Sequence, residues 1–525
     1  MRRARSDVDH ADRPAVATAI GPPAGQPQST ASAGPPRPEW QHMVKQRGPV
    51  VLLAAMMLVY FAVFGTLTWR QHANFGTLGY DMGIYDQAIW LLSRFKTPFV
   101  TVRGLNYFGH HVNPVTMLLV PFYWLDAGPG FLYLVETASI AAGAVPIWLL
   151  GRDRLANPWI ALGPVAAFLL YPTLQWINWW HFHPDALIVA PLLFAYWLAT
   201  RQRWGWFFAA VAVTLSCKED AALAVFGLGV LLLLRRQWRA GALTAVAGLV
   251  YFQVAAWIIR RANGGLGALY AESFPGYGDS LASVLSSMLR HPGTTLSALV
   301  QPDRLQYYRE VLSPMAFLPV AAAPVLLITA PQVAVNALTS YTPARNANFH
   351  YSSIVAAGVF AAAVEACARL GRRVGIQRFL VGLLVAAALA TNVARAPSPL
   401  GAPYHTGIWA APQPKHAAMR EALRLVPPSA GVSATDNLIP HLTHRVYAYI
   451  FPHPWQLPFW GVQGSSPPDP RTVDYLVLDM TTTSIGIDQE PTYRELTKTD
   501  GEFRVIYDRA GIVVARRNSV GSPSP

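Results

Sequence analysis

Charged residues are scarce in this sequence, and so is cysteine. Only 13% of its 525 residues are Asp, Glu, Lys or Arg, while 53% are hydrophobic and the mean hydropathy is +0.27. A soluble globular protein has about 25% charged residues, so this composition excludes an ordinary cytosolic enzyme. Cys217 and Cys367 both stand in apolar segments, so the sequence predicts neither a disulfide framework nor a cysteine-ligated zinc site.

Several common motifs are missing as well. No apolar run lies between Met1 and Pro49, which argues against a cleavable secretory signal. The sequence has no solenoid repeat and no glycine-rich phosphate-binding loop, which argues against nucleotide hydrolysis on this chain. The net charge of +13 comes from basic residues scattered through short loops, whereas a nucleic-acid-binding protein gathers them on one face.

Long apolar blocks dominate instead. Their lengths are those of bilayer-crossing segments, and they predict about eleven transmembrane helices, at 50–68, 128–150, 158–174, 185–200, 204–217, 220–234, 240–259, 311–328, 331–342, 352–370 and 379–395. Because Pro324 and Pro331 interrupt the segment 311–342, we expect it to enter and leave the membrane as two short or broken helices. A single span there would reverse the side of everything that follows.

Arginine clusters orient these helices. Short cytoplasmic loops carry an excess of Lys and Arg, so we expect four loops to be cytoplasmic, together with a disordered basic tail at 1–48. The opposite, extracytoplasmic side then receives the loops 69–127 and 260–310 and most of the acidic residues of the membrane domain (49–399). The four loops contain Arg152 and Arg154; Arg201 and Arg203; Arg235, Arg236 and Arg239; and Arg372, Arg373 and Arg378.

The composition changes after about residue 400. A helical pattern at 415–426 is followed by short β-like runs and an alternating end that resembles a hairpin. These patterns predict a small extracytoplasmic α/β domain at 400–517 and a disordered end at 518–525. The expected fold class is therefore an all-α polytopic membrane protein with a small C-terminal α/β soluble domain.

Two aspartates stand in the first outer loop, in GYDMGIYDQAIW. Asp81 and Asp86 are five residues apart, which separates them by about 140° on a regular helix, so we expect only one of them to face a substrate. A carboxylate in a half-dry cleft suits a general base, because burial raises its pKa towards the working range. The structural alternative is that both aspartates cap helices or pair with arginines.

Four further clusters lie on the same predicted side. Their histidines are candidates for hydrogen bonds to substrate hydroxyls or phosphate, for a divalent metal site, or for anchoring in an aromatic belt. Lys218 and Arg345 are candidates for binding a lipid-linked phosphate; alternatively, Lys218 pairs with its acidic neighbours and Arg345 reaches lipid headgroups. The clusters are His110 and His111; His181, His183 and Asp185; Lys218, Glu219 and Asp220; and Arg345, His350 and Tyr351.

Taken together, these motifs resemble a known family. The stretches GYDMGIYDQAIW, FGHHVNPVTMLLVPFYWL, FHPDALIVAPLLFAYWLA, CKEDAALAVFGLGVLLL and NFHYSS, in this order, are similar to the bacterial multi-pass family called domain of unknown function 2079. That family is grouped with the GT-C glycosyltransferases, integral membrane enzymes that move a sugar from a polyprenyl-phosphate carrier to an acceptor on the outer face. The resemblance puts Asp81 in the place of the acidic residue of the family's first loop, with Asp86 as the second candidate.

The resemblance implies an inverting glycosyltransferase of the bacterial plasma membrane. In this hypothesis Asp81 is the general base, Lys218 and Arg345 stabilise the leaving phosphate, and the histidine clusters with Asp185 line the sugar site. The implied partners are a polyprenyl-phosphate sugar donor, a cell-envelope glycan, lipid or protein acceptor, and the bilayer, with no nucleic acid. No cofactor is specified, and a divalent metal is an open alternative.

Two rival hypotheses come from other classes. A transporter or flippase for a lipid-linked or polar solute would use Glu136, an acid inside a predicted span, and the broken segment 311–342. Most acids stand at the outer boundary and no repeated halves are visible, which favours the enzyme. The third hypothesis is a scaffold without catalytic activity that binds envelope polymers.

Overall fold

The computed structural model describes residues 39–265, 273–278, 281–458 and 460–518. Residues 1–38 of the predicted tail, residues 519–525 of the predicted end and part of the loop 260–310 lie outside the described residues. Residues 39–48, predicted as disordered tail, are instead helical and begin the helix Glu39–Ala73. The chain divides after Arg47 into two units. The account below concerns the larger unit, Gly48–Pro525.

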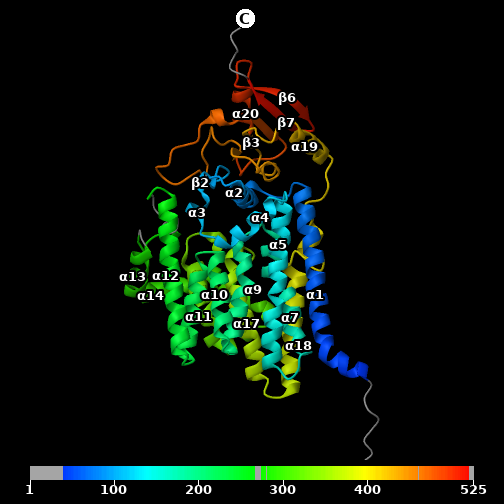
Figure 1. The fold of residues 1–525 in the computed structure, drawn as a ribbon, viewed down its shortest axis with the longest axis vertical. Helices are drawn as coiled ribbons and strands as arrows, with labels where there is room; N and C mark the ends of the chain where they lie inside the picture. The colour runs from blue at the N-terminus through cyan, green and yellow to red at the C-terminus, as the bar shows by residue number, and fades with distance from the viewer. Residues whose placement is uncertain (1–38, 266–272, 279–280, 459, 519–525) are drawn as a thin grey trace, which may run out of the picture. The chain divides into compact units, whose positions relative to one another are not determined.

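Helices make up most of this unit (Figure 1). Those that follow the predicted apolar blocks are α1 (Glu39–Ala73), α5 (Pro129–Ala142), α6 (Ala144–Arg154), α7 (Leu162–Leu169), α8 (Pro172–Trp179), α9 (Val189–Thr200), α10 (Trp204–Cys217), α11 (Ala221–Leu234), α12 (Trp238–Ala262), α16 (Ala330–Leu338), α17 (Ser353–Leu370) and α18 (Val374–Arg395). The predicted block 158–174 is two helices because Pro172 cannot continue the hydrogen bonds of α7 and instead begins α8.

Several of these helices are long and apolar enough to cross a bilayer. Within the described ranges, five pass this test: Arg47–Ala73, Pro129–Arg154, Trp238–Ala262, His350–Leu370 and Val374–Arg395. A bent pair would make a sixth, and four other apolar helices have 10–17 residues. The structure therefore has the expected apolar helices, while the count of eleven spans stays a prediction.

The irregular segment after α15 (Pro302–Leu312) is broken at an unexpected place. Pro302–Met315 and Leu318–Ile328 meet at 113°, and the bend falls at Ala316 and Phe317, whose φ angles are 49° and 57°. Pro324 and Pro331, the expected breaks, both lie after this bend, and Pro324 follows a second break at Ala322 (φ −115°, ψ 39°). Pro331 instead occupies the first turn of α16, where its missing N–H costs no hydrogen bond.

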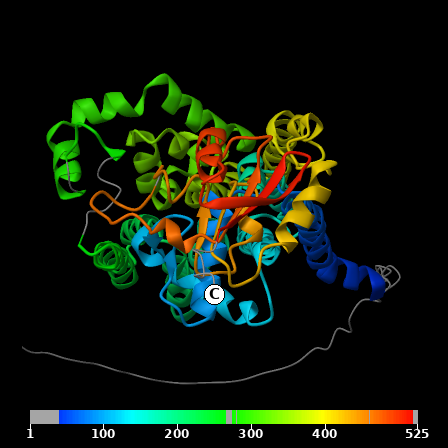
Figure 2. The same ribbon diagram turned by 90° about the horizontal axis from the view of Figure 1, so that it is seen from above.

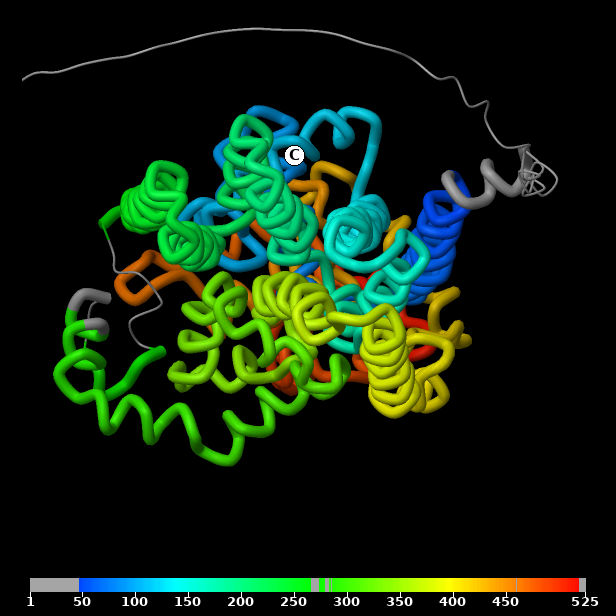
Figure 3. The backbone as a smooth tube through the Cα atoms, turned by 90° about the horizontal axis from the view of Figure 1, so that it is seen from below, coloured from blue at the N-terminus to red at the C-terminus, as the bar shows by residue number. Residues whose placement is uncertain are grey.

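Figure 3 shows the helical bundle from the end opposite the C-terminus. Helix α17 is the most buried of the long helices. The sequence of α17, SIVAAGVFAAAVEACARL, is rich in small residues that let neighbouring helices approach closely. A Cβ at Gly358 would lie 2.8 Å from Thr329. Arg369 donates to the carbonyl of Ala321 and Asn336 donates to that of Tyr351, each at 3.1 Å, so the stretch 321–336 runs antiparallel to α17.

The basic loops follow helix ends that lie together. The Nε of Arg154 contacts Glu365 at 3.0 Å, and the hydroxyl of Tyr196 donates to the same carboxylate at 2.8 Å. Arg235 in turn donates to that hydroxyl at 3.0 Å. These contacts join the C-terminal ends of α6, α9, α11 and α17, so the loops that follow them share one side of the helical bundle.

A five-stranded sheet covers the opposite helix ends (Figure 2). The strand order is β4-β3-β5-β7-β6, with β3, β4 and β5 parallel and β5, β7 and β6 antiparallel. Ala510 and Gly511, with φ angles of 53° and 76°, form the tight turn of the final hairpin. The elements are α19 (Lys415–Arg424), β3 (Val432–Ala434), β4 (Ala448–Ile450), β5 (Tyr475–Asp479), α20 (Glu490–Thr497), β6 (Phe503–Arg509) and β7 (Ile512–Arg517).

Candidate functional site

Ionisable side chains converge at the helix ends beneath this sheet, which we call the capped end. They come from the ends of α8, α10 and α3 (Tyr107–His110), the starts of α9, α11 and α17, and the turn η1 (Gly79–Gly83) that leads into α2 (Ile84–Ser93). We call this group the Asp81 site. Its members are Asp81, His110, His111, His181, His183, Asp185, Lys218, Glu219, Asp220, His350 and Tyr351.

Asp81 is the most exposed carboxylate of this group. It lies in a π-helical turn, and 31% of its side chain is accessible, compared with 25% or less for Asp185, Glu219 and Asp220. The Nε2 of His183 lies 3.5 Å from its Oδ1. Burial disfavours the charged carboxylate, but the neighbouring imidazoles, His183 above all, outweigh this effect and hold the pKa of Asp81 below its usual value. The sequence-based expectation that burial raises this pKa is therefore wrong.

Two contacts orient the ring of His183. Its Nδ1 lies 2.6 Å from the carbonyl oxygen of His181. Because a carbonyl oxygen only accepts, Nδ1 is the donor in this contact. The opposite nitrogen, Nε2, faces the Asp81 carboxylate at 3.5 Å.

Aromatic stacking fixes this histidine. The ring of His350 stacks on His183 with centroids 3.7 Å apart. The ring of Tyr351 follows at 4.1 Å, and the Nζ of Lys218 lies 5.3 Å from the Tyr351 centroid. The start of α17 thus connects the Asp81 carboxylate to the buried cation of the site.

The remaining acids are paired. The Nζ of Lys218, which is 1% exposed, lies 2.8 Å from Asp185 and 3.6 Å from Asp220. Burial opposes its charge, but these carboxylates outweigh burial and raise the pKa of Lys218 above its usual value. Glu219 contacts the Nδ1 of His111 at 2.7 Å and accepts from the backbone N–H of Val112 at 3.0 Å.

Burial keeps several histidines of the site neutral. It lowers the pKa of His181 to about 4 and the pKa values of His110 and His111 well below their usual range. His181 accepts from the backbone N–H of Leu78 at 3.1 Å and contacts the Tyr133 hydroxyl at 3.2 Å. Across the described part of the chain, no group of three or more His, Cys, Asp or Glu side chains is arranged to hold a metal ion.

Asp86 lies in a different environment. It is fully buried and accepts from the Tyr123 hydroxyl at 2.6 Å and from the hydroxyl of Thr443, while the Nε2 of His444 lies 3.2 Å away. Burial disfavours an imidazolium, but Asp86 outweighs this and raises the pKa of His444. Asp86 therefore joins α2 to the C-terminal segment.

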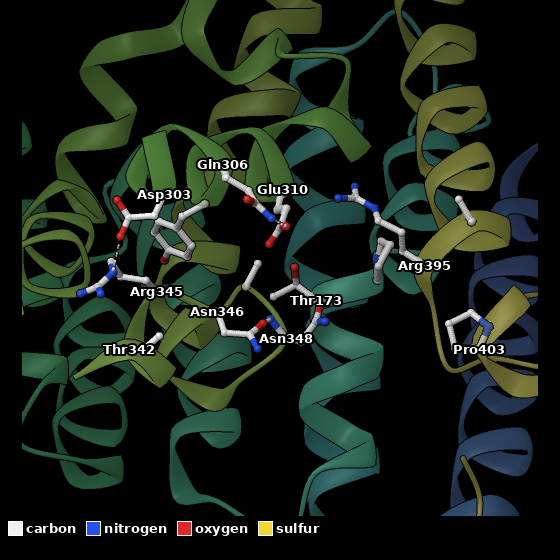
Figure 4. Close-up of a pocket in the computed structure, with 14 residues that line it drawn as sticks. Thr173, Asp303, Gln306, Glu310, Thr342, Arg345, Asn346, Asn348, Arg395 and Pro403 are labelled. Atoms are coloured by element: carbon white, nitrogen blue, oxygen red, sulfur yellow. Dashed lines mark hydrogen bonds and ion pairs between the residues drawn. The ribbon is translucent and has the colours of Figure 1, made fainter. Parts of the chain in front are cut away.

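Arg345 also lies apart from the Asp81 site. Its Nε contacts Asp303 at 3.1 Å and its guanidinium donates to the carbonyl of Thr339. Figure 4 shows it beside Asp303 in a cavity. The structure thus brings together all the site residues predicted from the sequence except Asp86 and Arg345.

Two residues of this region escaped the sequence analysis. The Oδ1 of Asp436 accepts from the backbone N–H groups of Gly79 and Tyr80 at 2.9 and 3.3 Å, so the C-terminal segment holds the turn that carries Asp81. Burial raises the pKa of Asp436 to about 6. Arg103 lies over the Tyr80 ring, 6.0 Å from its centroid. Neither residue has a spacing signal of its own in the sequence.

The chain matches a known family over most of its length. A family model described as a predicted membrane protein, DUF2079, matches residues 71–514. The chain belongs to this family. No curated protein sequence matches the chain significantly.

The family relation is supported by a solved structure. The apo crystal structure of ArnT from Cupriavidus metallidurans has a TM-score of 0.54 to this DUF2079 protein and 14% sequence identity, and the match covers 89% of this chain and 97% of that chain. ArnT is a GT-C glycosyltransferase. The likeness shows that the two proteins share a fold.

Proposed function

We propose that this protein is a GT-C glycosyltransferase that moves a sugar from a polyprenyl-phosphate donor to an acceptor, with Asp81 as the general base. The observation that carries the proposal is the state of the acids at the capped end. Asp185, Asp220 and Glu219 pair with Lys218 or His111, whereas Asp81 is partly exposed and has a histidine beside it. The GT-C fold supports the reaction class.

The proposed reaction is a single displacement. The acceptor hydroxyl gives its proton to Asp81 as its oxygen forms a bond to the anomeric carbon. The bond from that carbon to the phosphate oxygen breaks, and its electron pair leaves with the polyprenyl phosphate. Because no second carboxylate is proposed as a nucleophile, the anomeric configuration inverts. The imidazole of His183, 3.5 Å from Asp81, favours the ionised carboxylate that accepts this proton.

Cations near the site serve the leaving group in this proposal. Lys218 belongs to the Asp81 site, and Arg103 lies over the ring of Tyr80, the residue before Asp81. We therefore assign the phosphate to this pair and remove Arg345 from that role, since it lies in a cavity outside the Asp81 site. Charges placed where the phosphate charge develops stabilise the transition state.

The membrane orientation in the proposal follows the basic loops. With those loops in the cytoplasm, the N-terminus is cytoplasmic, and the Asp81 site and the C-terminal sheet are extracytoplasmic in the bacterial plasma membrane. The acceptor is then a glycan, lipid or protein of the cell envelope, and the donor's prenyl chain lies in the outer leaflet.

A transporter is the second candidate function. Glu136 supports it, because this acid is fully buried in α5 and an intramembrane acid is a functional candidate by default. The bend of 113° after α15 is the other feature that it would use.

Release of polyprenyl phosphate tests the enzyme. The wild-type protein in nanodiscs is incubated with a panel of polyprenyl-phosphate-linked pentoses and hexoses and with a bacterial envelope extract as the source of acceptors, and the released carrier is measured by mass spectrometry. We expect release from at least one donor, and a fall of about 10² to 10⁴ in rate for Asp81→Asn, the contribution of one general base.

The matched control is Asp126→Asn, which removes a nearby acid outside the Asp81 site and should keep the wild-type rate. No release from any donor, or an Asp81→Asn rate within a factor of three of wild type, contradicts the proposal. For the transporter, the same nanodisc protein would move polyprenyl-phosphate-linked sugar between leaflets without releasing the carrier, and Glu136→Gln would stop this movement.

A further inference from the structure

A cavity of about 560 Å³ opens beside the loop that carries Arg345 (Figure 4). Residues of α8, α15, the loop 342–348 and the end of α18 line it. Its volume is typical of small-molecule sites, which measure about 300–1,000 Å³. It is distinct from the Asp81 site, since it contains none of that site's members.

The lining combines polar and apolar surface, and its charges balance. Two carboxylates face two guanidinium groups, with side-chain amides between them. Such a surface offers many donors and many acceptors but no net charge. The groups concerned are Asp303, Glu310, Arg345, Arg395, Asn346 and Asn348.

The charged groups are held in place but keep hydrogen-bonding capacity. Glu310 accepts from the Nε2 of Gln306 at 2.8 Å, and Arg395 donates to the Oγ of Ser313 at 3.0 Å. A carboxylate offers about four lone-pair sites and a guanidinium has five N–H donors, so each retains positions for a ligand. These contacts fix the lining before any ligand arrives.

We propose that this cavity binds a neutral, hydroxyl-rich saccharide, and that this saccharide is the acceptor; the acceptor role rests on the proposed function. A hydroxyl both donates and accepts, so it matches a lining of mixed donors and acceptors. An anionic ligand would face the carboxylates of Asp303 and Glu310, and an apolar ligand would leave the polar groups without partners, which costs free energy.

Chain connectivity joins the cavity to the Asp81 site. Asn348, in the lining, is followed by Phe349, whose ring stacks on Trp180 with centroids 4.4 Å apart. The next residue, His350, stacks on His183, the partner of Asp81. Trp180 follows Thr173 of the cavity lining and precedes His181 of the Asp81 site, just as Phe349 stands between Asn348 and His350. This aromatic pair therefore separates the cavity from the Asp81 site along both stretches of the chain. In this proposal the reacting end of the saccharide extends from the cavity past this pair to Asp81.

Saccharide binding by the full-length protein tests the inference. The probes are neutral di- and trisaccharides of pentoses and hexoses, measured by saturation-transfer NMR on the protein in nanodiscs. We expect at least one to bind at millimolar concentration, and Asn348→Ala and the cavity-filling Ala394→Trp each to weaken binding at least tenfold. Leu389→Trp is the matched control, because it places the same side chain on an exposed position of α18 outside the cavity lining.

The outcomes separate the cavity from the enzyme. Binding of none of the saccharides, or binding unchanged in both cavity variants, overturns the inference. Tighter binding of a sulfated form of the same saccharide also overturns it, because the charge argument then fails. Saccharide binding without release of polyprenyl phosphate from any donor supports the cavity and contradicts the proposed function, whereas release without saccharide binding does the reverse.

Discussion

Replacing Asp86 by Asn should lower the free energy of unfolding, whereas the same replacement of Asp81 should leave it almost unchanged. Asp86 is fully buried and accepts from two hydroxyls, of Tyr123 and Thr443, with His444 beside it. Hydrogen bonds to a charged group contribute about 1.5–3 kcal/mol each, and an amide reproduces only part of this set. We therefore expect Asp86→Asn to lower the free energy of unfolding by about 2–4 kcal/mol, the range for loss of part of a buried network.

Asp81→Asn should leave stability almost unchanged. The carboxylate is 31% accessible and the imidazole of His183 lies 3.5 Å away. The loss in free energy of unfolding is therefore within about 1 kcal/mol, as for partly exposed ion pairs. Both variants are compared in nanodiscs by thermal unfolding followed through tryptophan fluorescence. An Asp81→Asn midpoint as low as that of Asp86→Asn would refute the division into a reactive and a structural aspartate.

Three further predictions follow from the same region. Burial lowers the pKa of His181 to about 4 from 6.5. Its neutral form therefore stabilises the fold fully above pH 6.5, and this stabilisation, about 3 kcal/mol, is lost as the pH falls towards 4. In His181→Gln the thermal unfolding midpoint should depend less on pH between 6.5 and 4 than in the wild type. Asp436→Ala should speed hydrogen exchange of the backbone at 78–83 several-fold, because the N–H of Tyr80 loses its acceptor, and unchanged exchange would contradict this. Lys218→Met should cost about 3–5 kcal/mol by leaving buried carboxylates unpaired, and adding Asp185→Asn should recover part of the loss in unfolding measurements.

The sequence predicted the Asp81 site because its residues flank apolar blocks. His183 lies just before α9 and Lys218 just after α10. Because α9 and α10 are successive antiparallel helices, the start of α9 and the end of α10 lie at the same end of the bundle. The stretch that contains His350 follows the same rule. Single positions within these stretches, such as the stacking of His350 on His183, depend on packing and have no pattern in the sequence.

Long-range contacts and local irregularities could not be predicted. Asp86 meets Thr443 across 357 residues, and no periodicity relates two such positions. The bend at Ala316 and Phe317 precedes both Pro324 and Pro331, the prolines that the sequence offered as breaks, so periodicity and proline positions did not locate it. Arg345 was misplaced for the same reason, because its partner Asp303 belongs to a helix outside every predicted span.

The hydrogen bonds from the turn that carries Asp81 to Asp436 can form only late in synthesis of the chain. Gly79 and its partner are separated by 357 residues, so the helices are synthesised and inserted long before residue 436 is made. Until then the turn lacks its acceptor, and a chain still on the ribosome has an incomplete site. Completion of the site thus requires synthesis at least as far as Asp436, and a protein truncated before this residue would sit in the membrane without it.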